Sequence, residues 1–188
     1  MNCYRNVVEF PILGTEPLPV ELANTIYLDD GEVTDFLATT ELVTAWFAAA
    51  DGAPLAASAA VPARELRDCV RAVLTAAVDG RVPDPTEIEA LNRYAAGAAR
   101  YPQLSWGADG VGSEWVDCGG GVTARLGRIA AATIELLVAE PDVRRCPGPG
   151  CSMLFVRDHA RRRFCHGSCG HRDRQARYYR RQRAITGY

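Results

Sequence analysis

Four cysteines near the end of the chain have the spacing that is most specific for one chemistry. They form a C-x4-C pair and a C-x3-C pair separated by 13 residues: Cys146, Cys151, Cys165 and Cys169. Two close pairs joined by a short segment are typical of a zinc site, because Zn2+ prefers soft thiolates in tetrahedral geometry. The spacing therefore predicts a closed structural site, in which four protein ligands leave no position for a catalytic water.

The residues around the cysteines predict how the four sulfurs converge. A Pro-Gly-Pro-Gly segment separates the first pair and favours a tight turn. The second pair stands at i, i+4, which predicts that both cysteines lie on one face of the first turn of a helix. We expect Phe155 and Phe164 to pack against this knuckle. Turn, hairpin and ligand-bearing helix make a treble-clef-like finger, whose fold should depend on the metal because so small a module has little core.

The four cysteines are also compatible with other interpretations. These are an iron–sulfur cluster, a zinc–thiolate redox switch, two disulfides, or four unliganded thiols. An odd total of seven cysteines argues against a closed disulfide framework. The remaining cysteines are expected to be buried as small apolar groups, and the histidines to lie at a helix start or to face phosphate. These residues are Cys3, Cys69, Cys118, His159, His166 and His171.

Charge is divided unevenly along the chain, although the formal net charge is only −2. Residues 1–141 contain 20 acidic residues and 9 arginines, whereas residues 142–188 contain 3 acidic residues and 12 arginines, and there is no lysine. Such a division predicts a basic segment that binds a polyanion. Two alternatives are a basic segment that folds back on the acidic body and a solvated basic face that has no partner.

The arginines after Cys169 point in nearly every direction at helical spacing, so this helix needs an external anion or a packed partner. Arginine makes bidentate contacts to phosphate and to guanine edges, which favours a helix that reads the major groove of double-stranded DNA. Tyr178 and Tyr179 keep RNA as the alternative partner. Because single zinc modules bind weakly, a homodimer is expected. The predicted nucleic-acid-binding residues are Arg157, Arg161, Arg162, Arg163, His171, Arg172, Arg174, Arg177, Arg180 and Arg181.

The rest of the chain is predicted to be mainly helical with one small antiparallel hairpin. The fold class is therefore α+β, with a helical body over residues 1–141 and the finger over residues 142–188. Apolar periodicity, caps and breakers predict helices at Pro19–Leu28, Thr40–Ala50, Ala63–Val78, from an Asp84 cap to about Arg100, and at Val122–Glu140. Ala53–Pro62 is predicted to be a linker, and Gln103–Trp106 and Ser113–Asp117 to be the strands.

The body offers little for catalysis. All three histidines lie in the finger, so no Ser-His-Asp set can form within residues 1–141, and we predict that the protein is not an enzyme. Binding of a small-molecule effector stays open. Asn24 and Thr25 could instead bond locally within a helix. The predicted pocket residues are Asn24, Thr25, Trp46, Arg67 and Arg71.

Membrane insertion and secretion are not expected. No uncharged apolar run approaches the ~18 residues of a membrane span. The segment Met1–Phe10 has no apolar region typical of a secretory signal. The expected location is the cytoplasm.

The finger residues also carry a resemblance to a known family. Arg145-Cys146-Pro147, Phe155–Asp158 and the segment from Arg163 to Arg172 resemble the CGNR zinc finger. That family usually follows an N-terminal ABATE domain, which is associated with stress-induced transcription regulation. Glu21–Thr25 resembles the Asn-Thr segment near the start of that domain, and Ala63–Arg67 resembles its arginine-rich helix. The resemblance implies four-cysteine zinc binding and DNA-linked regulation.

Two positions depart from the pattern of the family. The Cys-Gly-Asn-Arg segment reads Cys169-Gly170-His171-Arg172 here, and Phe164 stands where the family usually has tryptophan. All four cysteines remain, so zinc ligation is still implied. If the asparagine of the family caps the helix or touches DNA, His171 must do either in a different way.

Overall fold

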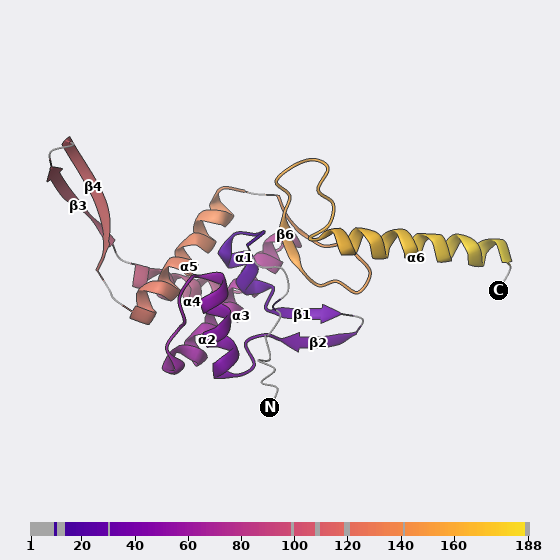
Figure 1. The fold of residues 1–188 in the computed structure, drawn as a ribbon, viewed down its shortest axis with the longest axis horizontal. Coiled ribbons are helices and arrows are strands. Elements are labelled where there is room, and N and C mark those ends of the chain that lie inside the picture. The colour runs from indigo at the N-terminus through magenta and orange to yellow at the C-terminus, as the bar shows by residue number, and fades with distance from the viewer. Residues whose placement is uncertain are drawn as a thin grey trace, which may run out of the picture.

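Among the residues that the structure describes, helices dominate and three short hairpins are attached to them (Figure 1). The computed structural model describes residues 10, 14–29, 31–98, 100–107, 110–118, 121–140 and 142–186. The helices of the body are α1 (Leu18–Ala23), α2 (Thr40–Ala50), α3 (Ala60–Val78), α4 (Pro85–Ala95) and α5 (Gly121–Val138), with 3-10 turns at Ala57–Ala59 and Ala96–Ala98. The hairpins are β1–β2 (Ile26–Asp29, Glu32–Asp35), β3–β4 (Arg100–Gly107, Gly110–Asp117) and β5–β6 (Val143–Arg145, Leu154–Val156). The last described element is α6 (Gly167–Thr186).

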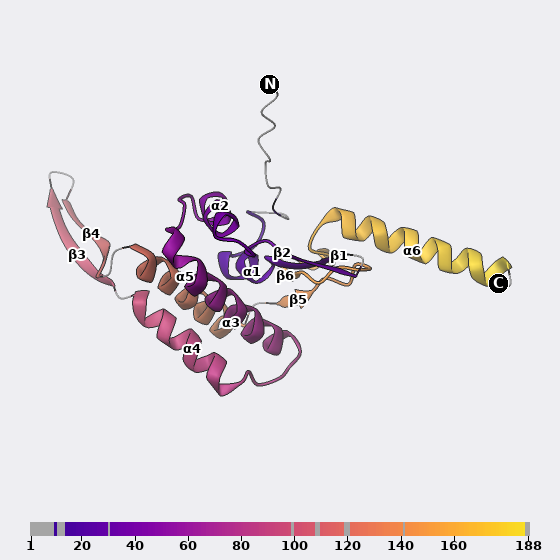
Figure 2. The same cartoon turned by 90° about the horizontal axis from the view of Figure 1, so that it is seen from below.

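Helix α3 is the centre of the hydrophobic core. Leu66, Val70, Val73 and Leu74 recur at helical spacing and are buried. The helix packs against α1, α4 and α5, and Figure 2 shows these helices gathered around it. The core also includes Leu154 of β6, so it extends beyond the helices of the body.

Glycines let α5 cross the end of α4 at very short range. A Cβ atom at Gly127 would lie 2.4 Å from the backbone nitrogen of Ala98 and 2.9 Å from the carbonyl oxygen of Tyr94. Any side chain here would force the two helices apart, because backbone cannot move aside as a flexible side chain can. This crossing sets the distance between α4 and α5 at the end of the body from which β3–β4 emerges.

Two elements project from opposite ends of the molecule. The hairpin β3–β4 extends at one end and α6 extends at the other (Figures 1 and 2). Leu104 and Val111 of the hairpin are 66% and 62% exposed. The finger hairpin β5–β6 lies between the body and α6, so α6 points away from the helical core.

Most of the predicted elements are confirmed. The helix at Thr40–Ala50 is present, and Thr39 caps it by accepting a hydrogen bond from the Leu42 amide. Asp84 forms the predicted capping box with Glu87. The fold class, mainly helical with small antiparallel hairpins and a four-cysteine finger, is also confirmed.

Three boundaries were predicted wrongly. The first helix ends at Ala23 rather than Leu28, because Ile26–Asp29 pairs as a strand with Glu32–Asp35. The predicted linker Ala53–Pro62 contains a 3-10 turn and the first turn of α3. Helix α4 ends at Ala95, and the chain is already in strand β3 at Arg100.

No helix among the described residues is both long and apolar enough to cross a membrane.

Candidate metal centre and basic helix

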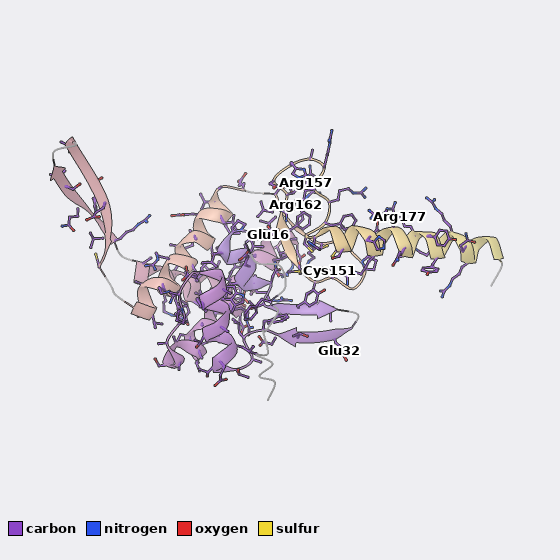
Figure 3. All side chains as sticks on the ribbon, viewed as in Figure 1. Glu16, Glu32, Cys151, Arg157, Arg162 and Arg177 are labelled. Atoms are coloured by element: carbon purple, nitrogen blue, oxygen red, sulfur yellow. The ribbon has the colours of Figure 1, made fainter. Side chains whose placement is uncertain are left out.

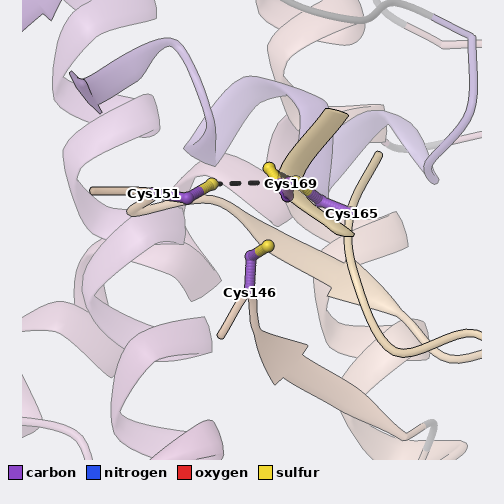
Figure 4. A group of neighbouring side chains, drawn as sticks. All are labelled: Cys146, Cys151, Cys165 and Cys169. Carbon is purple, nitrogen blue, oxygen red and sulfur yellow. Dashed lines mark hydrogen bonds between the residues drawn. The ribbon is translucent and has the colours of Figure 1, made fainter. Parts of the chain in front are cut away.

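The four predicted cysteines converge on one point (Figure 4). Their Sγ atoms all lie within 4.8 Å of one another. The Sγ atom of Cys165 is 3.7 Å from that of Cys151 and 3.6 Å from that of Cys169. A Zn–S bond of about 2.3 Å in a tetrahedral site places sulfurs about 3.8 Å apart. The observed spacing therefore fits a tetrahedral tetrathiolate metal site.

A tight turn between β5 and β6 holds the first pair of ligands. The Cys146 amide donates to the Met153 carbonyl at 2.8 Å, and the Cys151 amide donates to the Gly148 carbonyl at 3.0 Å. A Cβ atom at Gly148 would lie 2.7 Å from the Cβ of Cys169. Only glycine lets this turn pass so close to a ligand that another element supplies.

The second pair does not share the first turn of a helix, so this prediction was wrong. Cys165 precedes α6, which begins at Gly167, and only Cys169 lies within it. The side chain of His166 caps the start of α6, because its Nδ1 accepts a hydrogen bond from the Ser168 amide at 3.2 Å. His166 therefore takes the predicted place at the helix start.

An apolar shell covers the cysteines. Phe155 is 1% exposed and packs with the cysteine cluster, as does the partly buried Phe164, which confirms the predicted role of both rings. Met153, which the sequence analysis missed, places its sulfur 4.0 Å from the Sγ of Cys165. The sequence signal that could have identified Met153 is its position between Cys151 and the apolar strand that follows. The shell buries Cys146, Cys165 and Cys169, whereas Cys151 is half-buried.

Four crowded sulfurs cannot all be thiolates without a cation. Hydrogen bonds from the Cys151 and Cys165 thiols lower the pKa of Cys146. The same bonds keep the donors protonated, so the pKa values of Cys151 and Cys165 rise. One thiol of the cluster therefore ionises readily, but ionisation of the other thiols needs a compensating positive charge. A divalent cation supplies that charge.

Arg172 adds a positive group beside the centre. Its Nη2 lies 3.2 Å from the Sγ of Cys169, one turn earlier in α6. A guanidinium at this distance stabilises negative charge on the sulfur. Arg172 was predicted to contact nucleic acid, but the structure directs at least one of its nitrogens toward the cysteine cluster.

Buried hydrogen bonds fix the finger to the body. The Asn24 side chain donates to the Leu154 carbonyl at 2.9 Å and accepts from the Leu154 amide at 2.8 Å. The Glu16 carboxylate accepts from the Val156 amide at 2.8 Å and pairs with Arg162. Both contacts bridge more than 120 residues of sequence, so the finger hairpin is held in place by residues at the start of the body.

Arg162 is thus a structural residue in this arrangement. Besides its ion pair with Glu16, it donates to the Val156 carbonyl at 2.9 Å, and its guanidinium lies 5.3 Å from the centre of the Phe155 ring. Its side chain is 15% exposed. Figure 3 shows Arg162 beside Glu16 at the base of the finger, whereas Arg177 stands on the projecting helix.

The other predicted nucleic-acid-binding residues differ in their surroundings. Arg157 pairs with Asp142 at 3.2 Å, and Arg177 pairs with Asp173 at 3.0 Å. The exposed members of the set are Arg161, Arg163, His171, Arg174, Arg177, Arg180 and Arg181. Arg161 and Arg163 lie in the loop before α6, and the other five exposed members lie on different sides of α6, whereas Arg162 is held inside the finger.

The predicted pocket residues make internal contacts. Arg67, 3% exposed, donates to both carboxylate oxygens of Asp35 at 2.6 and 3.2 Å, and Arg71 donates to the Ala23 and Ile26 carbonyls at 3.1 and 2.8 Å. Thr25 donates to the Leu22 carbonyl at 2.7 Å. Trp46 is buried in the core. Three cavities of about 370, 540 and 240 Å3 are lined by other residues, and Asn24 lines only a small one of about 10 Å3. A ligand pocket at these positions stays a prediction.

The scattered cysteines have different environments. Cys69 is buried, as predicted, whereas Cys118 is exposed, so that prediction was wrong. Cys118 directly follows the projecting strand β4, which offers it no core to enter. Cys3 lies outside the described residues.

Comparison with protein-family models assigns both parts of the chain. Residues 16–140 match the ABATE model, described as a putative stress-induced transcription regulator, and residues 143–182 match the CGNR zinc finger. Neither description is that of an enzyme family. No curated protein matches the chain. The chain thus belongs to the ABATE family, and it carries a CGNR zinc finger whose four cysteines meet at one point.

Proposed function

We propose that the protein is a zinc-dependent transcription regulator that binds double-stranded DNA through α6. The observation that carries the proposal is the position of α6, which starts at the metal centre and projects away from the body with exposed arginines (Figure 1). A helix of 20 residues is about 30 Å long. An α-helix of this kind fits the major groove of B-form DNA.

Zinc is the metal of this proposal. Four thiolates at tetrahedral spacing match its preference, and the apolar shell around Cys146, Cys165 and Cys169 suits a structural ion. The metal would hold the β5–β6 turn against the first turn of α6. The direction in which the arginine helix points would then depend on metal binding.

The division of charge supports a nucleic-acid partner. The acidic body repels a polyanion, so binding is directed to the finger and to α6. A single helix supplies a small contact, and a homodimer on two half-sites would supply a larger one. In this proposal the body senses a signal or forms the dimer contact.

Binding measured by fluorescence anisotropy tests the proposal. The zinc-loaded full-length chain is titrated against labelled duplex DNA, single-stranded DNA and duplex RNA at several salt concentrations. We expect tighter binding to duplex DNA, an affinity that falls steeply with salt, and loss of binding when a chelator removes the metal. A preference for RNA, or equal binding with and without metal, would overturn it. The Cys118→Ser variant is the control for thiol loss outside the site.

A further inference from the structure

Burial divides α6 into two faces. Cys169 is buried, and Arg172, Asp173 and Ala176 are half-buried. These positions are i, i+3, i+4 and i+7, so they form one stripe, the inner face, on the side of α6 that carries the ligand Cys169. The positions on the opposite side are exposed and have the same spacing: His171, Arg174, Gln175, Tyr178 and Arg181. We call this set the outer stripe.

The arginines of the two faces differ in their partners. On the inner face Arg172 approaches the Cys169 sulfur at 3.2 Å, and Arg180, exposed one turn after Ala176 on the same side, donates to the Ala176 carbonyl at 3.4 Å. Arg177, at the edge of this face, pairs with Asp173. Arg174 and Arg181 of the outer stripe have no hydrogen-bond or ion-pair partner in the part of the chain that the structure describes. Their guanidinium groups are therefore available to a ligand.

The outer stripe has the chemistry of base recognition. Arginine binds guanine O6 and N7 with two hydrogen bonds, and glutamine binds adenine N6 and N7 in the same way. Arg174 and Arg181 are seven residues apart, which is about 10.5 Å along the helix and matches about three base pairs. The stripe therefore offers two groups suited to guanine and one suited to adenine.

We infer that the outer stripe reads base edges in the major groove. Arg174 and Arg181 each contact a guanine, about three base pairs apart, and Gln175 contacts an adenine beside the Arg174 guanine. The inner face stays turned toward the metal centre and does not read bases. The inference rests on the proposed function, because it names which residues give that DNA binding its sequence preference.

Selection from a random duplex library tests the inference with the full-length zinc-loaded chain. The variants are Arg174→Lys, Arg181→Lys and, as the matched control on the inner face, Arg180→Lys. Each keeps its charge but loses the planar pair of donors. We expect Arg174→Lys and Arg181→Lys each to lose the preference for guanine at one position, with about 10- to 100-fold weaker binding to the selected site. Arg180→Lys should keep the wild-type motif.

The outcomes separate the inference from the proposed function. If the wild-type chain binds duplex DNA but selects no motif, or if both outer variants keep the wild-type motif, the inference is wrong and the proposed DNA binding stands. If the wild-type chain binds no duplex, both are wrong. All three substitutions are at exposed positions, and circular dichroism with bound-zinc measurement checks that each variant folds.

Discussion

Asn24 shows how one side chain can join two distant parts of the chain. The sequence offered two interpretations of it, a pocket residue and a local helix partner. In the structure its amide instead forms two buried hydrogen bonds with the backbone of Leu154, as a neighbouring strand would. The Asn24 side chain thus occupies the edge of β6 that does not pair with β5.

Removing this amide should destabilise the protein strongly. The Asn24→Ala variant leaves the amide and the carbonyl of Leu154 buried without partners, and each unsatisfied group costs about 1–3 kcal/mol. We expect the free energy of unfolding to fall by about 2–4 kcal/mol. Urea denaturation measures the change. Asn92→Ala, at an exposed position of α4, is the control and should change stability by less than about 0.5 kcal/mol. Equal effects of the two substitutions would contradict the role of Asn24.

Helices and strands could be predicted where the sequence pattern that specifies them lies within a few neighbouring residues. Asp84 with Glu87 is a capping pattern that works within four residues, and the apolar period of α3 is visible in the sequence. The strand at Ile26–Asp29 depends on pairing with β2 and was missed. The cysteine cluster was predicted because metal-ligand spacing is a strong signal, whereas the Glu16–Arg162 pair spans 146 residues and has no local signature.

One contact between elements can be followed through its pH dependence. The single hydroxyl proton of Tyr94 in α4 has two acceptors within reach on α3, the Pro62 carbonyl at 3.0 Å and the Glu65 carboxylate at 3.1 Å from the hydroxyl oxygen. Burial, followed by the hydrogen bond to Glu65, raises the pKa of Tyr94 to about 12. The unfolded chain would lose this proton near pH 10. The folded state therefore binds the proton more tightly, and its stability should fall as the pH rises from about 10 to about 12.

The Tyr94→Phe variant separates this effect from other alkaline titrations. We expect it to be less stable than the wild type near pH 8, because the hydrogen bonds are lost, and the difference to shrink as the pH approaches 12. Thermal unfolding of both proteins over this range measures the difference. A constant difference would mean that the tyrosine does not link α4 to α3 as the distances indicate.

At the scale of the whole molecule, the body and the finger share one hydrophobic core. Leu154 belongs to the core cluster of the helices, and Val143 and Val156 pack against it. Together with Asn24 and Glu16, these contacts run from the metal centre to α1. The boundary predicted near residue 142 follows the change in charge and the two family models, but the packing continues across it. Metal binding in the finger should therefore be coupled to the stability of the body.

Hydrogen exchange on the full-length chain, with and without zinc, tests this coupling. Removing the metal frees the β5–β6 turn, which withdraws the partners of Asn24 from the end of α1. We expect protection of the amides of Val20–Asn24 to fall together with that of β6. Helix α4, which contacts α3 through Tyr94, and α5, which crosses the end of α4 at Gly127, should keep theirs. Readdition of zinc should restore the lost protection. Unchanged protection in α1 after the finger has lost its metal would mean that the two parts are energetically independent. A signal sensed by the body could then reach α6 only by another route.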